Sequence, residues 1–245
     1  MYKSITPLIS ATSATLITAF QWWRDILREA SIQGSHSLIV VKGLKAGIIL
    51  FIASEVIFFF SFFWAFFHRA TCPTPDIGAY WPPIGINPFN PLGIPLLNTL
   101  LLVSSGITIT WSHHSLIIKI QIQSKKALLT TILLGLYFTA LQSIEYWQAE
   151  FNIRDSVYGA TFFIATGFHG LHVIVGRIFL AINIIQINKI TIRHNHYVGF
   201  EAAAWYWHFV DVVWLFLYTT IYWWGIYSFS INSTPNFHLG SLKSK

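Results

Sequence analysis

Charged residues are scarce in this chain of 245 residues: they make up 10% of it, against about 25% in average soluble domains. Hydrophobic residues account for 54% and aromatic residues for 17%. This composition excludes an ordinary soluble domain and predicts a polytopic membrane protein. The net charge of +6 does not indicate nucleic acid as a partner, because basic residues of membrane proteins usually lie in loops and set the orientation.

Cysteine is nearly absent as well. Only Cys72 is present, which excludes an internal disulfide and any paired-cysteine redox or zinc motif. No glycine-rich phosphate loop, HExxH sequence or nucleophile elbow occurs, so we expect no catalytic residue in this chain. No cleavable signal or arginine-rich transit peptide opens the sequence. We therefore expect a protein made inside an organelle, or in a bacterium, and inserted directly into the membrane.

Long apolar runs, in contrast, dominate the chain. Five of them are long enough to cross a bilayer, at 43–68, 96–118, 127–149, 156–187 and 200–225. A shorter run at 5–20 lies at the lower length limit, and the prolines within 70–95 exclude a helix there and predict a rigid cover. The predicted fold class is all-α: a polytopic membrane helix bundle with five full transmembrane helices plus one short N-terminal helix.

The runs also divide the chain. We expect a short N-terminal helix and interface segment at 1–29, a five-helix transmembrane bundle at 30–228, and a polar C-terminal tail at 229–245. When the turns are assigned alternately to the two sides, nine of the 15 basic residues fall on one side. The positive-inside rule makes that side the matrix or cytoplasm, which leaves the C-terminus on the outer side.

The last apolar run carries an ionisable pair. His208 and Asp211 are three residues apart, so they share one helical face, and their cost in hydrocarbon predicts that they face protein. His169 and His172 likewise share a face and form the best metal-like pair in the chain. Depth along antiparallel helices places His169, His208 and Asp211 near one level. We therefore expect a buried polar cluster that contains His169, His172 and His208, with Asp211 beside it. A packing role and a proton or cofactor site both remain open.

Two further histidines, His113 and His114, are adjacent and point about 100° apart on a helix, so they do not easily share one metal. Glu55 is the only acid of its run and lies near the middle of the bilayer. Such a carboxyl group is either a neutral, hydrogen-bonded packing group or part of a proton relay.

A basic and aromatic segment follows the short N-terminal run. Trp22 and Trp23 are typical of the membrane interface, and Arg24 and Arg28 share a helical face. These residues form either an ordinary interfacial belt or a phospholipid site, with the arginines binding the headgroup phosphate.

Several of these stretches resemble one family. AWYWHFVDVVWLFLY followed by IYWWG, the Glu55 region SEV-x-FF-x-x-FFWAF, and TFFIATGFHGLHVIVG are similar to helices of cytochrome c oxidase subunit III. The resemblance runs from about Gln21 to Gly225. It implies a non-catalytic core subunit of the respiratory oxidase, or complex IV, that supports electron transfer from cytochrome c to oxygen and coupled proton pumping.

The resemblance also implies cofactors and partners. Haem and copper belong only to the partner subunits, so no metal site is expected here and His169, His172 and His208 become packing histidines. Subunit I is the chief expected partner, with subunit II, accessory subunits and structural phospholipids beside it. Lipid is expected at Trp22, Trp23, Arg24 and Arg28, and the family acid matching Glu55 reacts with carbodiimides.

The resemblance is incomplete at the N-terminus, where the first helix of the family has no counterpart. We therefore expect a separate polypeptide to supply that wall of the lipid cleft. The mitochondrial inner membrane is the expected location, ahead of a bacterial plasma membrane, with the C-terminus towards the intermembrane space. Two other function classes stay open: a polytopic transporter using Glu55 and Asp211, and a membrane haem protein using His169 and His172.

Overall fold

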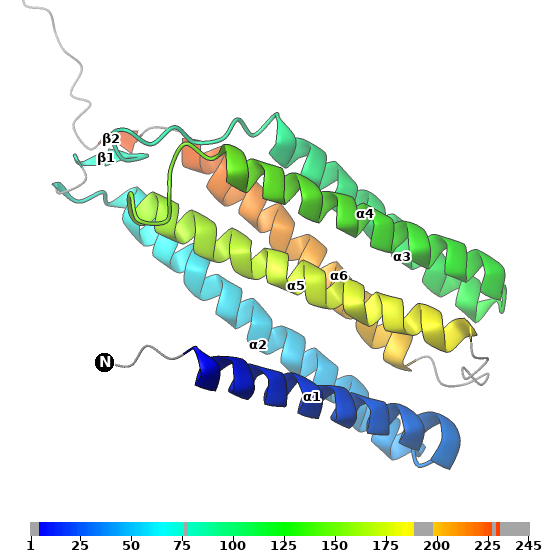
Figure 1. Ribbon diagram of the computed structural model, residues 1–245. Coiled ribbons are helices and arrows are strands. Elements are labelled where there is room, and N and C mark those ends of the chain that lie inside the picture. Colours follow the sequence, from blue (N-terminus) through cyan, green and yellow to red (C-terminus); the bar gives the residue numbers. More distant parts are fainter. Residues whose placement is uncertain (1–4, 76–77, 189–197, 227–228, 231–245) are drawn as a thin grey trace, which may run out of the picture.

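The computed structural model of the chain describes residues 5–75, 78–188, 198–226 and 229–230. These residues form six α-helices and two short strands (Figure 1). The α-helices are α1 (Thr6–Arg28), α2 (Leu38–Thr71), α3 (Ile94–Ile117), α4 (Gln121–Gln148), α5 (Val157–Asn188) and α6 (Val198–Leu217). A π-helical turn (Tyr218–Trp223) and a 3-10 turn (Trp224–Ile226) prolong α6. The predicted all-α class is confirmed, and five described helices, α2 to α6, are long and apolar enough to cross a membrane.

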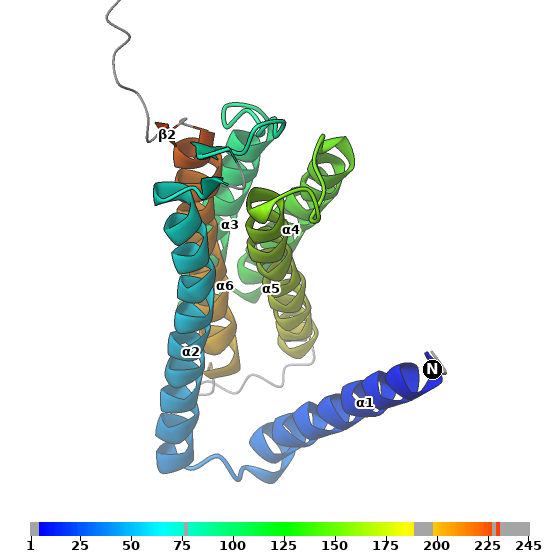
Figure 2. The ribbon, with the colours of Figure 1, turned by 90° about the vertical axis from the view of Figure 1, so that its left-hand side faces the viewer.

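Helix α6 is the centre of the bundle, with α2, α3 and α5 packed around it (Figure 2). Its core residue is Trp207, which is fully buried. Glycines on two neighbouring helices make room for this indole: a Cβ on Gly135 or Gly176 would lie 2.7 or 2.9 Å from ring atoms of Trp207. Close helix contact through small residues is what drives packing in a membrane, where the lipid is as apolar as the side chains.

Helix α1 stands apart from the bundle, joined to it only through the turn before α2 (Figure 2). None of its residues is buried, and the hydroxyls of Thr12, Thr15 and Thr18 bond to carbonyls of their own helix. The helix passes into a π-helical segment, Glu29–Gln33, and stops at Gly34, whose φ of 66° is left-handed. The two stretches predicted at 5–20 and 21–29 therefore form one helix, longer than expected. At 23 residues it is long enough to cross a membrane, but it is less apolar than α2 to α6 and is not among the candidate spans.

The proline-rich segment between α2 and α3 covers one end of the bundle, as predicted. Trp81 is fully buried there, with its ring 5.3 Å from that of Phe66 and 5.5 Å from that of Tyr158. Strand β1 (Tyr80–Trp81) of this cover pairs antiparallel with β2 (Phe229–Ser230). The predicted tail at 229–245 thus begins with a strand, and its remainder from residue 231 lies outside the described residues, as does the basic stretch 189–197.

Candidate functional site

Glu55 lies halfway along α2 and faces α5. Its Oε2 is 2.9 Å from Nε2 of His172, and both side chains are largely buried. Aromatic rings enclose the imidazole, with Phe59 at 5.1 Å and Tyr206 at 6.2 Å between ring centroids. The pair joins α2 to α5 halfway along α2, so each polar group has a partner inside the bundle.

The hydrogen bonds of this pair determine how many protons it holds. Nδ1 of His172 lies 2.7 Å from the carbonyl oxygen of Phe168, and a carbonyl only accepts, so Nδ1 carries a hydrogen. The contact between Nε2 and Glu55 then needs one more proton, placed on either the carboxyl or the ring. In both arrangements the pair is neutral as a whole, as a buried site in a membrane requires.

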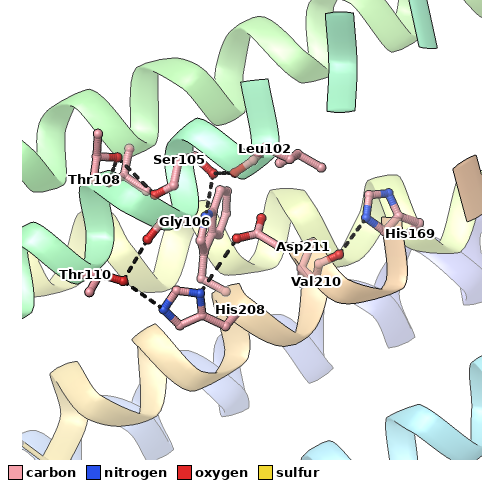
Figure 3. A network of polar contacts seen from close by, with 11 residues as sticks. Leu102, Ser105, Gly106, Thr108, Thr110, His169, His208, Val210 and Asp211 are labelled. Carbon is pink, nitrogen blue, oxygen red and sulfur yellow. Dashed lines mark hydrogen bonds and ion pairs between the residues drawn. The ribbon is translucent and has the colours of Figure 1, made fainter. Parts of the chain in front are cut away.

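His208 and Asp211 form a second polar site, on the side of α6 that faces α3 (Figure 3). Nδ1 of His208 is 3.9 Å from Oδ2 of Asp211, which is too long for a hydrogen bond, and its Nε2 is 3.4 Å from Oγ1 of Thr110. Gly106 of α3 makes room for the carboxyl group, because a Cβ at that position would lie 2.8 Å from Oδ2. His208 and Asp211 are therefore neighbours, but no direct hydrogen bond joins the two side chains.

His169 lies on α5, apart from the pair of His208 and Asp211 (Figure 3). It is fully buried, and its Nε2 is 3.2 Å from the carbonyl oxygen of Val210. His172, one turn along the same helix, pairs with Glu55 instead. The three histidines expected in one polar cluster thus have three different partners among the described residues. Rotation of α6 explains the separation: Val210 and Asp211 are adjacent and point about 100° apart.

The basic and aromatic end of α1 faces outward. Trp22 and Trp23 are 67% and 56% exposed. Nε of Arg24 donates to Oδ1 of Asp25 at 2.8 Å, and Arg28 lies 3.9 Å from the same oxygen. The hydrogen bond and charge of Arg24 lower the pKa of the Asp25 carboxyl, and Asp25 raises the pKa of the guanidinium. Two arginines thus share one carboxylate, so residues 22–28 keep one positive charge in excess, before Glu29.

One buried acid was missed by the sequence reasoning. Glu145, near the end of α4, is fully buried beside Tyr222. Amide groups of Asn98 and Gln142 continue the polar cluster, 3.4 Å apart, and Gln142 donates to the hydroxyl of Tyr222 at 3.4 Å. The signal was the i, i+3 spacing of Gln142 and Glu145, which places both on one face of α4.

Metal ligands do not gather among the described residues: no group of three or more His, Cys, Asp or Glu side chains is placed to hold a metal ion. His113 stacks on Phe200, with ring centroids 5.7 Å apart. His169 and His172, the best pair by sequence, point to different partners.

Comparison with known proteins adds a decisive observation. Residues 1–226 match the family described as "Cytochrome c oxidase subunit III". This chain belongs to the cytochrome c oxidase subunit III family. The resemblance inferred from the helices around Glu55, His169 and Asp211 is confirmed, and the match also includes residues 1–20, which precede the stretch on which that inference was based.

Curated members of the subunit III family are close in sequence. "Cytochrome c oxidase subunit 3" of Loxodonta africana is 57% identical over 224 residues, which cover 91% of this chain and 86% of that protein. The protein of the same name from Lemur catta is 60% identical over 217 residues, or 89% of this chain and 79% of the relative. The Ornithorhynchus anatinus protein is 58% identical over 224 residues. The chain is thus a multi-pass membrane subunit of cytochrome c oxidase, and its partners are the other subunits of that complex.

Proposed function

We propose that this subunit III supports electron transfer from cytochrome c to oxygen, and the coupled proton pumping, by binding subunit I and structural phospholipids. It carries no haem or copper of its own in this proposal, and the redox centres stay in the partner subunits. The proposal keeps the division into an N-terminal interface segment at 1–29, a bundle at 30–228 and a tail at 229–245.

The observation that carries the proposal is the exposure of α1. A helix with no buried residue, exposed tryptophans and two arginines cannot be stabilised by its own chain, so lipid or another polypeptide must cover it. Arg24 and Arg28 suit a phosphate, since guanidinium groups bind it through several hydrogen bonds, while Trp22 and Trp23 suit the headgroup level. A neighbouring polypeptide covering the apolar length of α1 completes the arrangement.

The paired acid supports a role in proton handling rather than redox chemistry. Glu55 and His172 share one proton in the middle of the bundle, and Asp211 lies beside His208 at similar depth. Neither site assembles enough ligands for a metal ion among the described residues. We therefore assign both acids to structure and to proton movement near the oxidase core.

The distribution of charge supports the proposed orientation in the mitochondrial inner membrane. The turns α1–α2 and α3–α4 lie at one end of the bundle (Figure 1). The arginines and lysines at positions 24, 28, 42, 45, 119, 125 and 126 lie in these turns or in the helix ends that they join. This end belongs on the matrix side by the positive-inside rule. Cys72, which is exposed at the opposite end, is then labelled by an impermeant maleimide added from the intermembrane side. Labelling only from the matrix side would reverse the orientation.

A density map of the purified intact oxidase tests the proposal. We expect ordered lipid, with its phosphate at Arg24 and Arg28, and a neighbouring helix against α1. Bare bilayer around α1, with neither lipid nor helix ordered there, would contradict the lipid-binding role. Metal analysis of the separated subunit is the companion measurement, and stoichiometric iron or copper in it would exclude the cofactor-free assignment.

A further inference from the structure

Helices α3 and α6 border a shallow, open groove of about 570 Å³ on the outside of the bundle. Its walls are mainly apolar and include Ile107, Trp111 and Leu215. Its polar side chains are Thr110, His114, His208 and Asp211, of which Thr110, His208 and Asp211 lie together. The groove therefore combines an apolar cleft with one polar patch, at the site drawn in Figure 3.

The polar patch is incomplete within this chain. Asp211 is only 8% exposed, and its Oδ1 has no hydrogen-bond partner in the described structure. The side chain of His208 is 45% exposed, and the 3.9 Å between its Nδ1 and Oδ2 of Asp211 leaves both atoms short of a direct hydrogen bond. Oδ1 itself is buried, whereas Oδ2 lies at the edge of the groove, where an additional hydrogen-bond donor would satisfy it.

Gly106 indicates that this arrangement is built into the sequence. A methyl group there would lie 2.8 Å from Oδ2 of Asp211 and 3.7 Å from Nδ1 of His208. The glycine therefore allows the carboxyl group to lie against α3 at the edge of the groove.

The depth of the patch decides what can supply the donor. His208 and Asp211 lie roughly 15 and 20 Å along α6 from its start at Val198, and Gly106 lies roughly 16 Å before the end of α3. That is well inside a hydrocarbon layer of about 30 Å, beyond the headgroups. Acyl chains can fill the apolar walls but cannot donate a hydrogen bond, so lipid alone leaves the patch unsatisfied.

We propose that this groove receives a transmembrane helix of another oxidase subunit, which places a hydroxyl or amide donor against Asp211 and His208. The inference rests on the proposed function, in which this chain binds other subunits, and it adds the surface and the chemistry of one contact. A helix fits because the groove runs between two helices, and its donor closes the gap that this chain leaves open.

Cross-linking in the intact oxidase locates the occupant. Ile107, which is 67% exposed on the groove wall, is replaced by cysteine in a Cys72→Ser background, so that only one thiol remains in this chain. A photoactivatable maleimide at this position should join a transmembrane segment of another oxidase subunit that has a Ser, Thr, Asn or Gln within one turn of the cross-link. Adducts with lipid only, or a segment without such a donor, would overturn the proposal.

Substitution of Asp211 tests the donor itself. Without cross-linking, Asp211→Leu should accelerate dissociation of the subunit identified in this way from the detergent-purified oxidase. We expect an increase of about three- to fifteenfold, the range for one hydrogen bond in a membrane. Asp211→Asn keeps an acceptor and should stay near the wild-type rate. Val212→Leu is the matched control, because Val212 is exposed on α6 but does not line the groove.

The signs of these results separate the alternatives. If the groove faces lipid, Asp211→Leu removes a costly polar group from hydrocarbon, so retention would be unchanged or improved, and the proposal would be wrong. If Asp211→Leu fails to assemble, the cross-link from residue 107 still decides the question, because it joins either a protein segment with a donor or lipid. A failure of the proposed function looks different, since this subunit would then be missing from the purified oxidase of the wild type.

Discussion

Helices α1 and α6 contain the same kinds of residue and use them in opposite ways. Helix α6 buries 11 of its 20 residues, whereas α1 buries none of its 23. The tryptophans differ most: Trp207 and Trp214 donate from Nε1 to hydroxyls of α3 at 2.8 and 3.0 Å, while Trp22 and Trp23 face outward. An aromatic residue with a polar tip thus serves either a protein core or a membrane interface, and the neighbouring residues decide which.

Small residues around Trp207 place its ring in the protein core. Gly135 and Gly176 leave the space that its ring fills, and Ser105 accepts its N–H. Helix α1 has no glycine within Thr6–Arg28, and the hydroxyls of Thr12, Thr15 and Thr18 bond to their own backbone, so α1 has no space for a large ring like the space around Trp207. The bundle therefore depends on packing within this chain, and α1 depends on its surroundings.

The largest effect should come from breaking the α6 core. Trp207→Ala removes a fully buried indole and leaves Ser105 without its donor, and truncation of a buried tryptophan costs about 3–5 kcal/mol. We expect the free energy of unfolding of the subunit to fall by that amount, measured by steric trapping in bicelles. Steady-state levels of assembled oxidase should fall with it.

Trp22→Ala is the matched control for this change, because it removes the same side chain from α1. Its effect on unfolding should be within about 0.5 kcal/mol, as for surface positions away from packed features. Ordered lipid beside α1 should decrease instead. If both substitutions destabilised the subunit equally, the contrast between a self-packed α6 and an externally supported α1 would be wrong.

This contrast also explains what the sequence could predict. Run lengths and prolines predicted the number and type of the helices, since a bilayer imposes a length on every span. The rotation of each helix about its axis was not accessible, because a hydrophobic run in a membrane is apolar on all sides. The depth argument accordingly placed His169 level with Asp211, yet rotation turned them to different neighbours.

The partner of Glu55 illustrates the same limit. Depth predicted an acid in the middle of the membrane, but no pattern indicated that His172, 117 residues later, would pair with it. Glu145 was missed because it stands in a polar stretch that is typical of a helix end at the interface. In the structure Glu145 is fully buried, with Tyr222 from the π-helical turn after α6 beside its carboxyl group.

An intermediate effect should come from the link between α2 and the bundle. Glu55→Leu leaves Nε2 of His172 without its partner in a buried site, and an unsatisfied buried group costs about 1–3 kcal/mol. Glu55→Gln should largely preserve the contact, because its amide donates to the ring nitrogen. We expect thermal inactivation of the assembled oxidase to occur at a lower temperature for Glu55→Leu and near the wild-type temperature for Glu55→Gln.

Turnover is the second readout of this pair. Electron transfer should be largely intact in Glu55→Gln, since we place no redox centre in this chain. His172→Leu should reproduce the instability of Glu55→Leu, and the double variant should add little, because both remove the same contact. Loss of turnover in a fully assembled Glu55→Gln oxidase would refute the supporting role assigned to this acid.

The smallest effect concerns charge at the end of α1. Oδ1 of Asp25 accepts a hydrogen bond from Nε of Arg24 at 2.8 Å, so Asp25 competes with any phosphate for that guanidinium group. Asp25→Asn should increase the anionic phospholipid retained by the purified oxidase a few-fold at most, since the groups are solvent-exposed and screened by salt. Lipid mass spectrometry of the oxidase at two salt concentrations measures this change. Glu29→Gln is the control: it removes an equal charge with no ion pair to Arg24 or Arg28 in the described structure.

The pH dependence of the same pair gives the sign of its contribution. Because Arg24 lowers the pKa of Asp25, chiefly through its hydrogen bond, the ion pair contributes fully above the ordinary carboxyl value of about 3.9. Its contribution is lost as pH falls through the lowered pKa of the folded state. Wild-type lipid retention at α1 should therefore stay flat between about pH 6 and 8, far above any Asp25 titration. Suppose that lipid retention by the wild type changed between about pH 6 and 8 and reached the level of the Asp25→Asn variant. Another titrating group, and not Asp25, would then limit the binding of phosphate at α1.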